Sequence, residues 1–197
     1  MNIDTGVGSR DRMIEAAIVL MRGSGLSGAG INEIVRESGA PKGSVYHFFP
    51  NGKLQIVTEA LEIYSRRIQA FIEQTLATET RAPDKVKALF EAFAQRAEDA
   101  DFRRSCAVGA VTLDLGEDLE TLRTVLATCL SEWVASIARH FDFGDASRSE
   151  SFAGLLLTTI EGAHIRARAE RSARPFREAG EWLAVLAETG TPLPGCE

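Results

Sequence analysis

Four polar side chains in one short stretch of the sequence have the chemistry to bind nucleic acid. They are Lys42, Ser44, Tyr46 and His47. Lysine can donate to guanine O6 and N7, and serine can bond to either kind of base. Tyrosine and histidine suit phosphate oxygens, and such contacts fix register without carrying sequence information. The same side chains are ordinary surface groups in many helical proteins, so the elements that present them decide their role.

Residues 31–49 predict two short helices joined by a tight turn. Apolar residues recur at helical spacing over residues 31–38, so this segment can form two turns of helix with one apolar face. Gly39 ends that helix, because glycine adopts the left-handed conformation without a Cβ penalty. Pro41 then begins a second helix, where its missing N–H costs nothing. This pattern is a helix-turn-helix, whose second helix brings its N-terminal side chains to base edges in the major groove.

The residues of this segment resemble the recognition-helix signature of the TetR family of bacterial transcriptional repressors. The matching stretches are Gly39–Pro50, Gly52-Lys53 and, earlier in the chain, Arg12–Ala17 with Gly25. The resemblance covers residues 9–60 strongly, and the remainder is similar in length and helical pattern. It implies an all-α, ligand-responsive repressor that is not an enzyme, carries no cofactor and binds double-stranded operator DNA.

Two further stretches refine this resemblance. Cys106–Val111 resembles a subgroup of regulators of multidrug-efflux genes. Just before the first motif helix, the family usually has Thr or Ser as a cap and phosphate ligand, whereas this chain has Gly28-Ala-Gly30. Glycine is an acceptable N-cap, and backbone N–H groups at a helix N-terminus can bind a phosphate. The residues expected at DNA are therefore Gly30, Lys42, Gly43, Ser44, Tyr46, His47 and Lys53.

Composition and charge describe an ordinary globular protein. The chain has 197 residues, of which 45% are apolar and 25% charged, and its net charge is −6. The first 53 residues hold six of the 22 Lys and Arg and five of the 28 Asp and Glu, so the acidity belongs to the remainder. A near-neutral segment suits a sequence-selective binder with few phosphate contacts. No apolar run approaches 18 residues and the N-terminus has no apolar region typical of a secretion signal, so we expect a cytoplasmic protein without a membrane span.

The apolar periodicity predicts an all-α fold of about nine helices with no convincing strand. We expect a three-helix DNA-binding domain in residues 1–52 and a helical ligand-sensing and dimerisation domain in residues 53–197. The expected helices outside the motif are Ser9–Gly23, Lys53–Ala77, Asp84–Ala100, Cys106–Leu115 (a broken helix or a loop), Glu117–His140, Ser149–Arg171 and Pro175–Glu188. Ser9 and Asp84 are expected to cap their helices.

Large apolar residues on the inward faces of the later helices are candidates for an inducer site. TetR-like proteins bind a small inducer there, and the resemblance implies a largely apolar one in this chain. Pockets between bundle helices are common ligand sites, although the same residues can form a plain core. The candidates are Phe71, Phe90, Phe93, Cys106, Val111, Leu130, Trp133, Phe152, Leu156, Ile160 and His164.

The last two long helices are the expected homodimer interface. Gly154, Thr158 and Gly162 form a strip of small residues that lets another helix approach closely, either within the chain or from a second copy. The expected interface residues are Gly154, Leu155, Thr158, Gly162, Trp182, Leu183 and Leu186. Two helices from each chain then make a four-helix interface that resembles the family's and closes at two subunits.

Other functions remain as alternatives. A helical-bundle enzyme or metal protein would bear a head that only resembles the motif. Glu161 and His164 lie one turn apart, as in carboxylate-bridged metal bundles, but no second such pair occurs, so we expect no metal. Cys106 follows two arginines, so it is either a redox sensor with a lowered thiol pKa or a small core residue. Cys106, Cys129 and Cys196 are too few for a disulfide scaffold. An orphan regulator without inducer is the last alternative.

Overall fold

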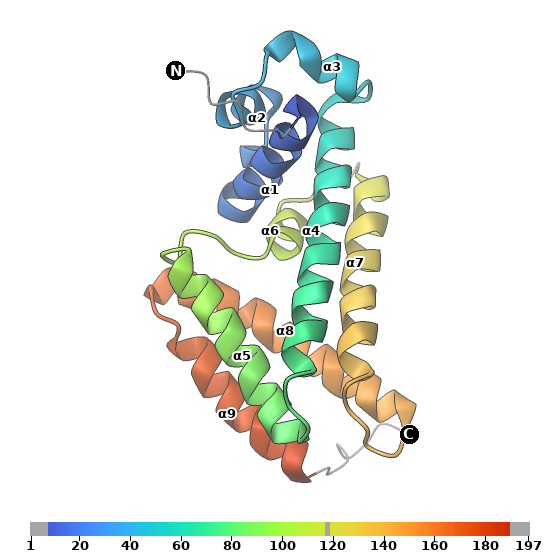
Figure 1. The fold of residues 1–197 in the computed structure, drawn as a ribbon, viewed down its shortest axis with the longest axis vertical. Helices are drawn as coiled ribbons and strands as arrows, with labels where there is room; N and C mark the ends of the chain where they lie inside the picture. Colours follow the sequence, from blue (N-terminus) through green and yellow to red (C-terminus); the bar gives the residue numbers. More distant parts are fainter. Residues whose placement is uncertain (1–7, 117–118, 190–197) are drawn as a thin grey trace. The chain divides into compact units, whose positions relative to one another are not determined.

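The computed structural model describes residues 8–116 and 119–189 of the chain. In this part the chain forms nine α-helices, one short 3₁₀ helix and no strand (Figure 1). The helices are α1 (Ser9–Gly28), α2 (Ile31–Ser38), η1 (Lys42–Ser44), α3 (Val45–Phe48), α4 (Gly52–Leu76), α5 (Ala82–Asp99), α6 (Ala107–Leu113), α7 (Glu120–Ala138), α8 (Ala146–Glu170) and α9 (Arg174–Thr189). The predicted all-α fold is confirmed. The expected helical residues 117 and 118, and Cys196, lie outside the described residues.

The chain divides into two compact units. Unit 1 comprises Met1–Ser65 and Cys106–Thr128, and unit 2 comprises Arg66–Ser105 and Cys129–Glu197. The helices α4 and α7 each begin in unit 1 and end in unit 2. The two units are defined by which residues pack together. The boundary expected after residue 52 instead separates a DNA-binding part of the chain from a ligand-sensing part. The division into a DNA-binding and a ligand-sensing domain therefore stays a prediction.

In unit 1, α1 buries its apolar stripe and then kinks where the sequence predicted an end. Met13, Ala17 and Met21 have no exposed surface. Ser24 and Gly25 are non-helical, and Gly25 has a φ of 64°, a left-handed conformation that favours glycine. The segment up to Gly28 resumes helical structure beyond this kink. The α6 helix, expected as a broken helix or a loop, is a short helix that packs on α1.

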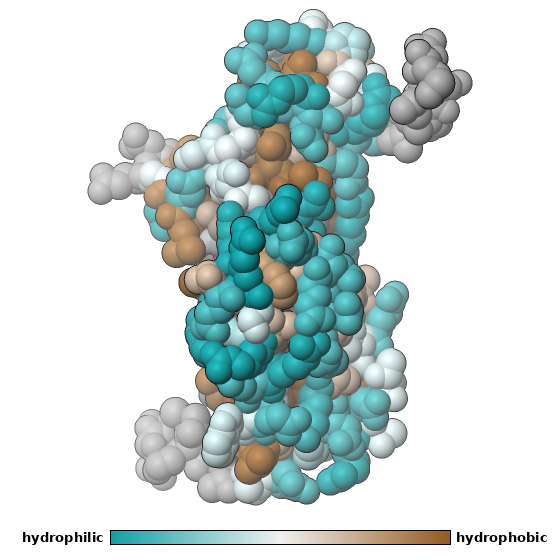
Figure 2. All heavy atoms as spheres, turned by 90° about the vertical axis from the view of Figure 1, so that its left-hand side faces the viewer, coloured by the Kyte–Doolittle hydropathy of each residue, from teal (hydrophilic) through white to brown (hydrophobic). Residues whose placement is uncertain are grey.

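In unit 2, α5 packs along α9 at close range (Figure 1). A Cβ atom added at Gly180 of α9 would lie 2.8 Å from the Cβ of Phe90, so only glycine allows this approach. Charged side chains join the outer edges of the two helices: Arg177 donates to Glu91 and to Glu98 at 2.9 Å. The face of the molecule drawn in Figure 2 is mostly hydrophilic. Burial of α5 against α9 therefore leaves a polar exterior.

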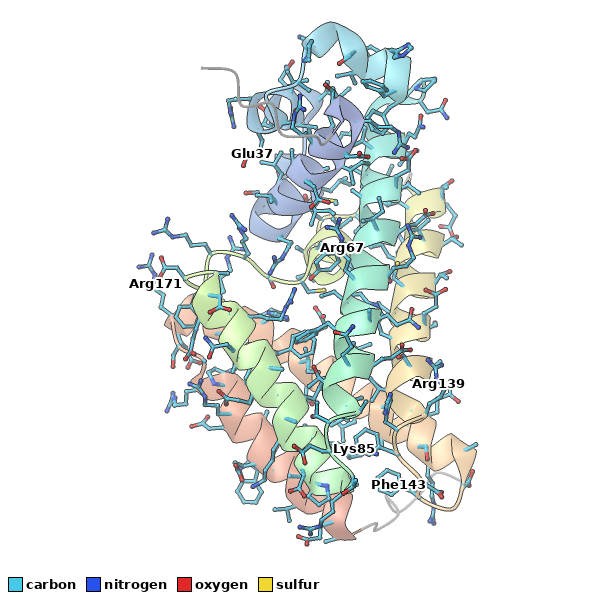
Figure 3. The ribbon with its side chains drawn as sticks, viewed as in Figure 1. Glu37, Arg67, Lys85, Arg139, Phe143 and Arg171 are labelled. Atoms are coloured by element: carbon cyan, nitrogen blue, oxygen red, sulfur yellow. The ribbon has the colours of Figure 1, made fainter. Side chains whose placement is uncertain are left out.

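The C-terminal end of α7 is fixed by polar contacts from α4 and α5. Glu73 accepts from Ser136 at 2.9 Å and from Arg139 at 2.7 Å. Lys85 (labelled in Figure 3) donates to the main-chain carbonyl of His140 at 2.8 Å, and the helix dipole favours a cation at this helix end. Burial and the Lys85 ammonium lower the pKa of His140 below its usual value.

Two predicted caps were wrong, and the predicted start of α8 was too late. Ser9 is the first helical residue of α1, and its hydroxyl accepts from Arg12 instead of capping the helix. Asp84 lies inside the first turn of α5, whose cap position is Arg81, because the proline before it suits a helical first turn. The α8 helix begins three residues early, because Asp145 accepts from a backbone N–H of its first turn at 2.8 Å.

Candidate nucleic-acid interface

The turn between α2 and α3 is held by a small set of hydrogen bonds. Gly39 has a φ of 62°, the left-handed conformation that the sequence predicted. The Ser38 hydroxyl donates to the Val35 carbonyl and accepts from the Ala40 N–H, both at 3.2 Å. From α1, the Arg12 Nε donates to the Ser38 carbonyl at 3.2 Å. A cation from α1 thus binds the last carbonyl of α2, where the helix dipole favours positive charge.

The short recognition element is anchored by its apolar side. The predicted second helix is a 3₁₀ turn, η1, followed by α3, and Pro41 stands before η1 in extended conformation. Val45 and Phe49 have no exposed surface. The Arg10 guanidinium lies 5.1 Å from the centre of the Phe49 ring, a cation–π contact. These anchors fix which side of α3 is buried.

The opposite side of this element presents polar groups to solvent. Lys42, Gly43 and His47 are exposed, and Tyr46 is 64% exposed. A Cβ atom added at Gly43 would meet no atom within 4 Å among the described residues, so backbone can approach a partner there. Few aromatic side chains are as exposed as that of Tyr46, and such exposure is typical of a binding surface. The structure therefore brings these predicted DNA residues together on one exposed side.

Three other predicted DNA residues already have contacts within unit 1. The Ser44 hydroxyl donates to the Pro41 carbonyl at 2.7 Å, which closes the 3₁₀ turn. Gly30 is the cap residue of α2, but the Glu33 carboxylate occupies the space where a side chain at this position would stand. A carboxylate at a helix N-terminus is favourable, and a phosphate would have to displace it. The Lys53 amine donates to the Leu26 carbonyl at 2.8 Å. Their roles at DNA stay predictions.

Of the residues predicted for an inducer site, Phe71, Phe93 and His164 come together in unit 2. The Phe93 ring lies edge-on to Phe71 at 5.2 Å and to His164 at 5.8 Å. Phe176, which the sequence analysis did not select, lies 5.0 Å from His164 and stacks with Phe93. Its signal was its place on the apolar face at the start of α9. These four rings, here called the aromatic cluster, are Phe71, Phe93, His164 and Phe176.

The remaining predicted inducer residues lie elsewhere or in the core. Phe152 packs edge-on to Phe141 and Phe143 (Figure 3), and Trp133 is 1% exposed. Phe90, Leu156 and Ile160 are buried, and Leu130 is half-buried. Cys106 and Val111 belong to unit 1 and to α6 or its cap.

The environment of Cys106 favours the structural interpretation of this residue. Its side chain is 3% exposed, and its sulfur accepts from the Gly109 N–H at 3.5 Å as the cap of α6. Arg103, one of the two arginines expected to lower its thiol pKa, forms an exposed ion pair with Asp101 at 2.9 Å. A buried capping sulfur is poorly accessible to oxidants. In the described part of the chain, no group of three or more potential metal ligands occurs.

The predicted dimer strip on α8 is open in the described structure. A Cβ atom added at Gly154 or at Gly162 would meet nothing within 4 Å, and Thr158 is exposed. Leu155 and Leu186 are half-buried, and Trp182 is 78% exposed. Leu183 instead belongs to the core of unit 2, because the side of α9 that carries it faces inward together with Gly180 and Ala184.

Two exposed apolar residues near this strip were missed by the sequence analysis. Ile165 is 58% exposed and Val185 is 55% exposed. Ile165 follows Thr158 by seven residues and therefore lies on the same side of α8. Val185 follows Trp182 by three residues on the outer side of α9. This helical spacing was the available signal.

An anchored helix-turn-helix that exposes polar and aromatic groups, followed by a long helix and an all-helical unit, defines a DNA-binding transcriptional regulator. Residues 13–60 match the model of "Bacterial regulatory proteins, tetR family", and residues 82–182 match "Transcriptional regulator LmrA/YxaF-like, C-terminal domain". The chain belongs to the TetR family, with an LmrA/YxaF-like C-terminal domain. It is a transcriptional regulator and not an enzyme, which overturns the enzyme alternative.

The relatives agree with this assignment over nearly the whole chain. The uncharacterized HTH-type regulator Rv0196 of Mycobacterium tuberculosis is 31% identical over 86% of this chain and 89% of its own. From Bacillus subtilis, YxaF is 29% identical over 90% of this chain and 94% of its own length. LmrA from the same organism is 29% identical over 94% of this chain and 90% of its own length. The family prediction is therefore confirmed.

Solved structures share the fold. A TetR regulatory protein from Rhodobacter sphaeroides superposes with a TM-score of 0.80 at 21% identity, over 90% of this chain and 97% of its own. A cysteine mutant of the TetR-family regulator CifR, complexed with 26-bp double-strand operator DNA, superposes with a TM-score of 0.77 at 17% identity. The match covers 89% of this chain and 94% of the CifR chain. Within residues 8–116 and 119–189, no helix combines the length and apolar character needed to cross a membrane.

Replacement of Lys42 by alanine tests the exposed side of the recognition element. We expect weaker operator binding and a salt dependence whose log–log slope is smaller by about 0.9, since one phosphate contact is lost. If Lys42 reads a guanine, the loss is instead about 1–3 kcal/mol and is confined to one base position. Binding is measured by fluorescence anisotropy at several salt concentrations.

Lys87→Ala is the matched control, because this exposed lysine of unit 2 pairs with Glu181. Operator affinity that is unchanged in both Lys42→Ala and Tyr46→Phe contradicts the assignment of this surface to DNA.

Proposed function

We propose that this regulator is a ligand-responsive repressor that binds a palindromic operator as a homodimer and dissociates on binding a small, largely apolar molecule. The observation that carries the DNA-binding part is the exposed polar side of η1 and α3, with Lys42, Tyr46 and His47, opposite the buried anchors Val45 and Phe49. We assign DNA binding to residues 1–52 and ligand sensing and dimerisation to residues 53–197. Such a regulator acts in the cytoplasm, where chromosomal DNA is accessible.

The contact with DNA is small, and this argues for two copies. One head carries a single short recognition element, and specific binding commonly uses a two-fold pair of heads on half-sites about 34–36 Å apart or a multiple of that. A CifR mutant with the same fold is known in complex with 26-bp operator DNA. By analogy, we infer a palindromic operator for this chain.

The second copy is proposed to pack on the open strip of α8 and the outer side of α9. Gly154 and Gly162 have free space where a side chain would stand, so packing within the described chain does not explain these glycines. Beside them, Ile165, Trp182 and Val185 expose large apolar surface. Water-exposed apolar area of this kind is characteristic of an interface. A self-complementary patch of this sort closes at two subunits.

The proposed ligand site is the aromatic cluster of unit 2. Phe71, at its edge, is half-buried and carries the Arg96 guanidinium 4.5 Å from its ring centre. Aromatic side chains with few polar groups typically line sites for small apolar ligands. The helix that carries Phe71, α4, begins at Gly52 immediately after the recognition element. A ligand that prefers one placement of α4 can therefore shift the equilibrium between DNA-binding states. The resemblance to regulators of multidrug-efflux genes is compatible with such a ligand.

Gly162→Leu tests the dimer proposal. We expect monomers with intact helicity and lost operator binding, because the added side chain fills the space reserved for the partner helix. Sedimentation gives the mass, and circular dichroism gives the helicity. Gln95→Leu on the exposed side of α5 is the control for an added exposed leucine outside the proposed interface. A Gly162→Leu variant that stays dimeric and still binds its palindrome means that the interface lies elsewhere.

The ligand proposal predicts reciprocal antagonism between ligand and DNA. A compound that changes Trp133 fluorescence should weaken operator binding, and operator DNA should weaken its binding by the same factor. Trp182→Phe leaves Trp133 as the sole tryptophan reporter. Phe93→Ala should abolish the response to ligand and leave operator affinity near that of the unmodified protein. A compound that binds at the aromatic cluster yet leaves operator affinity unchanged places the switch elsewhere, as in an orphan regulator.

A further inference from the structure

The last part of α1 and the link to α2, residues 24–30, contain a kink and are held by contacts from other helices. Ser24 and Gly25 leave helical geometry, and the chain then reaches Gly30, the cap of α2. The direction of residues 24–30 sets where α2 begins. It thereby also sets the position of the recognition element that follows α2. Groups that fix the segment therefore help to position the DNA-binding surface.

From α6, Asp114 binds this segment directly. Its Oδ2 accepts from the Ser27 N–H at 2.6 Å, and it follows the last residue of α6. A Cβ atom added at Gly25 would lie 3.0 Å from the same oxygen and 3.3 Å from the Ala110 carbonyl oxygen. The end of α6 thus fits against the kink because Gly25 has no side chain. A hydrogen bond to a carboxylate is stronger than a neutral one.

From α4, Lys53 binds the neighbouring residue of the same segment. Its amine donates to the Leu26 carbonyl at 2.8 Å, and its side chain is half-buried. Leu26 and Ser27 are joined by one peptide bond. The carbonyl of this bond accepts from Lys53 of α4, and its N–H donates to Asp114 at the end of α6. The opposite charges of Lys53 and Asp114 favour this arrangement. Hydrogen bonds from the Ser27 side chain and backbone, together with the Lys53 charge, lower the pKa of Asp114.

We propose that Lys53 and Asp114 form a clamp on Leu26 and Ser27 that positions the helix-turn-helix motif for operator binding. Asp114 is then a determinant of operator affinity that lies outside the motif. Lys53 acts through the clamp and not as a phosphate ligand. This role differs in kind from that of Lys42, since a positioning residue affects specific binding without adding a charge contact to DNA.

The inference rests on the proposed operator binding, and the slope of affinity against salt separates the two roles of Lys53. We expect Lys53→Met and Asp114→Ala each to lower operator affinity by about tenfold, the size expected for a lost hydrogen bond to a charged group. The double variant should be no weaker than the weaker single variant, because both changes open the same clamp. The salt slope and the affinity for non-operator DNA should stay at the values of the unmodified protein.

Three further variants keep the test informative. Asp114→Asn retains an oxygen that can accept from Ser27, so it should recover most of the affinity lost in Asp114→Ala. Gly25→Ala should reproduce the loss from the α1 side, since its methyl group displaces the carboxylate and its backbone is strained at a φ of 64°. Glu120→Ala removes an exposed acidic charge of α7 that pairs with Arg123, and it should leave operator affinity unchanged. Unfolding temperatures identify any variant that simply loses its fold.

The clamp is contradicted by either of two results. If Lys53→Met lowers the salt slope by about 0.9 and weakens non-operator DNA equally, Lys53 is a phosphate ligand. If Asp114→Ala binds operator as tightly as the unmodified protein or more tightly, Asp114 does not position the motif. In both cases Lys42→Ala still reports on the DNA-binding surface itself, so failure of the clamp is distinguishable from failure of the proposed function.

Discussion

The proposed DNA-binding surface depends on tertiary contacts that hold a helix too short to be stable by itself. The recognition element spans only residues 42–48, as a 3₁₀ turn and one turn of α-helix, whereas isolated helices need about 12–15 residues. Its conformation comes from Val45 and Phe49, which have no exposed surface, and from the Gly39 turn that aims it. Burial on one side is what leaves Tyr46 and its polar neighbours exposed on the other.

The same constraint applies to α6 in unit 1. This helix has seven residues, and its ends are fixed by a buried cysteine cap at its start and a carboxylate at its finish. Its position depends on Gly25, whose left-handed backbone and missing side chain create the space that α6 occupies. Short helices that are stable only through contacts with neighbouring elements shift position when those elements move slightly. This property is compatible with the proposed switch between DNA-binding and non-binding arrangements of the head.

Local signals in the sequence predicted those features that depend on local chemistry. The bounds of α2 follow from apolar spacing and Gly39, and both match the structure. Tertiary partners were beyond such signals. The amine of Lys53 and the hydroxyl of Ser44 donate to main-chain carbonyls. A residue pattern does not predict such contacts. Leu183 was predicted at the dimer interface, but close packing of α9 against α5 buries it. The ring of Phe176 contacts rings from α5 and α8 that are distant in sequence.

We propose that this chain recognises a two-fold symmetric DNA sequence through paired short recognition helices. Selection of binding sites from random double-stranded DNA by the purified protein tests it most directly. We expect enrichment of one palindrome, with half-site centres one helical turn apart or a multiple of that. A protein changed at both Lys42 and Tyr46 should lose this enrichment. Enrichment of no sequence, or of a single unpaired half-site, would contradict it.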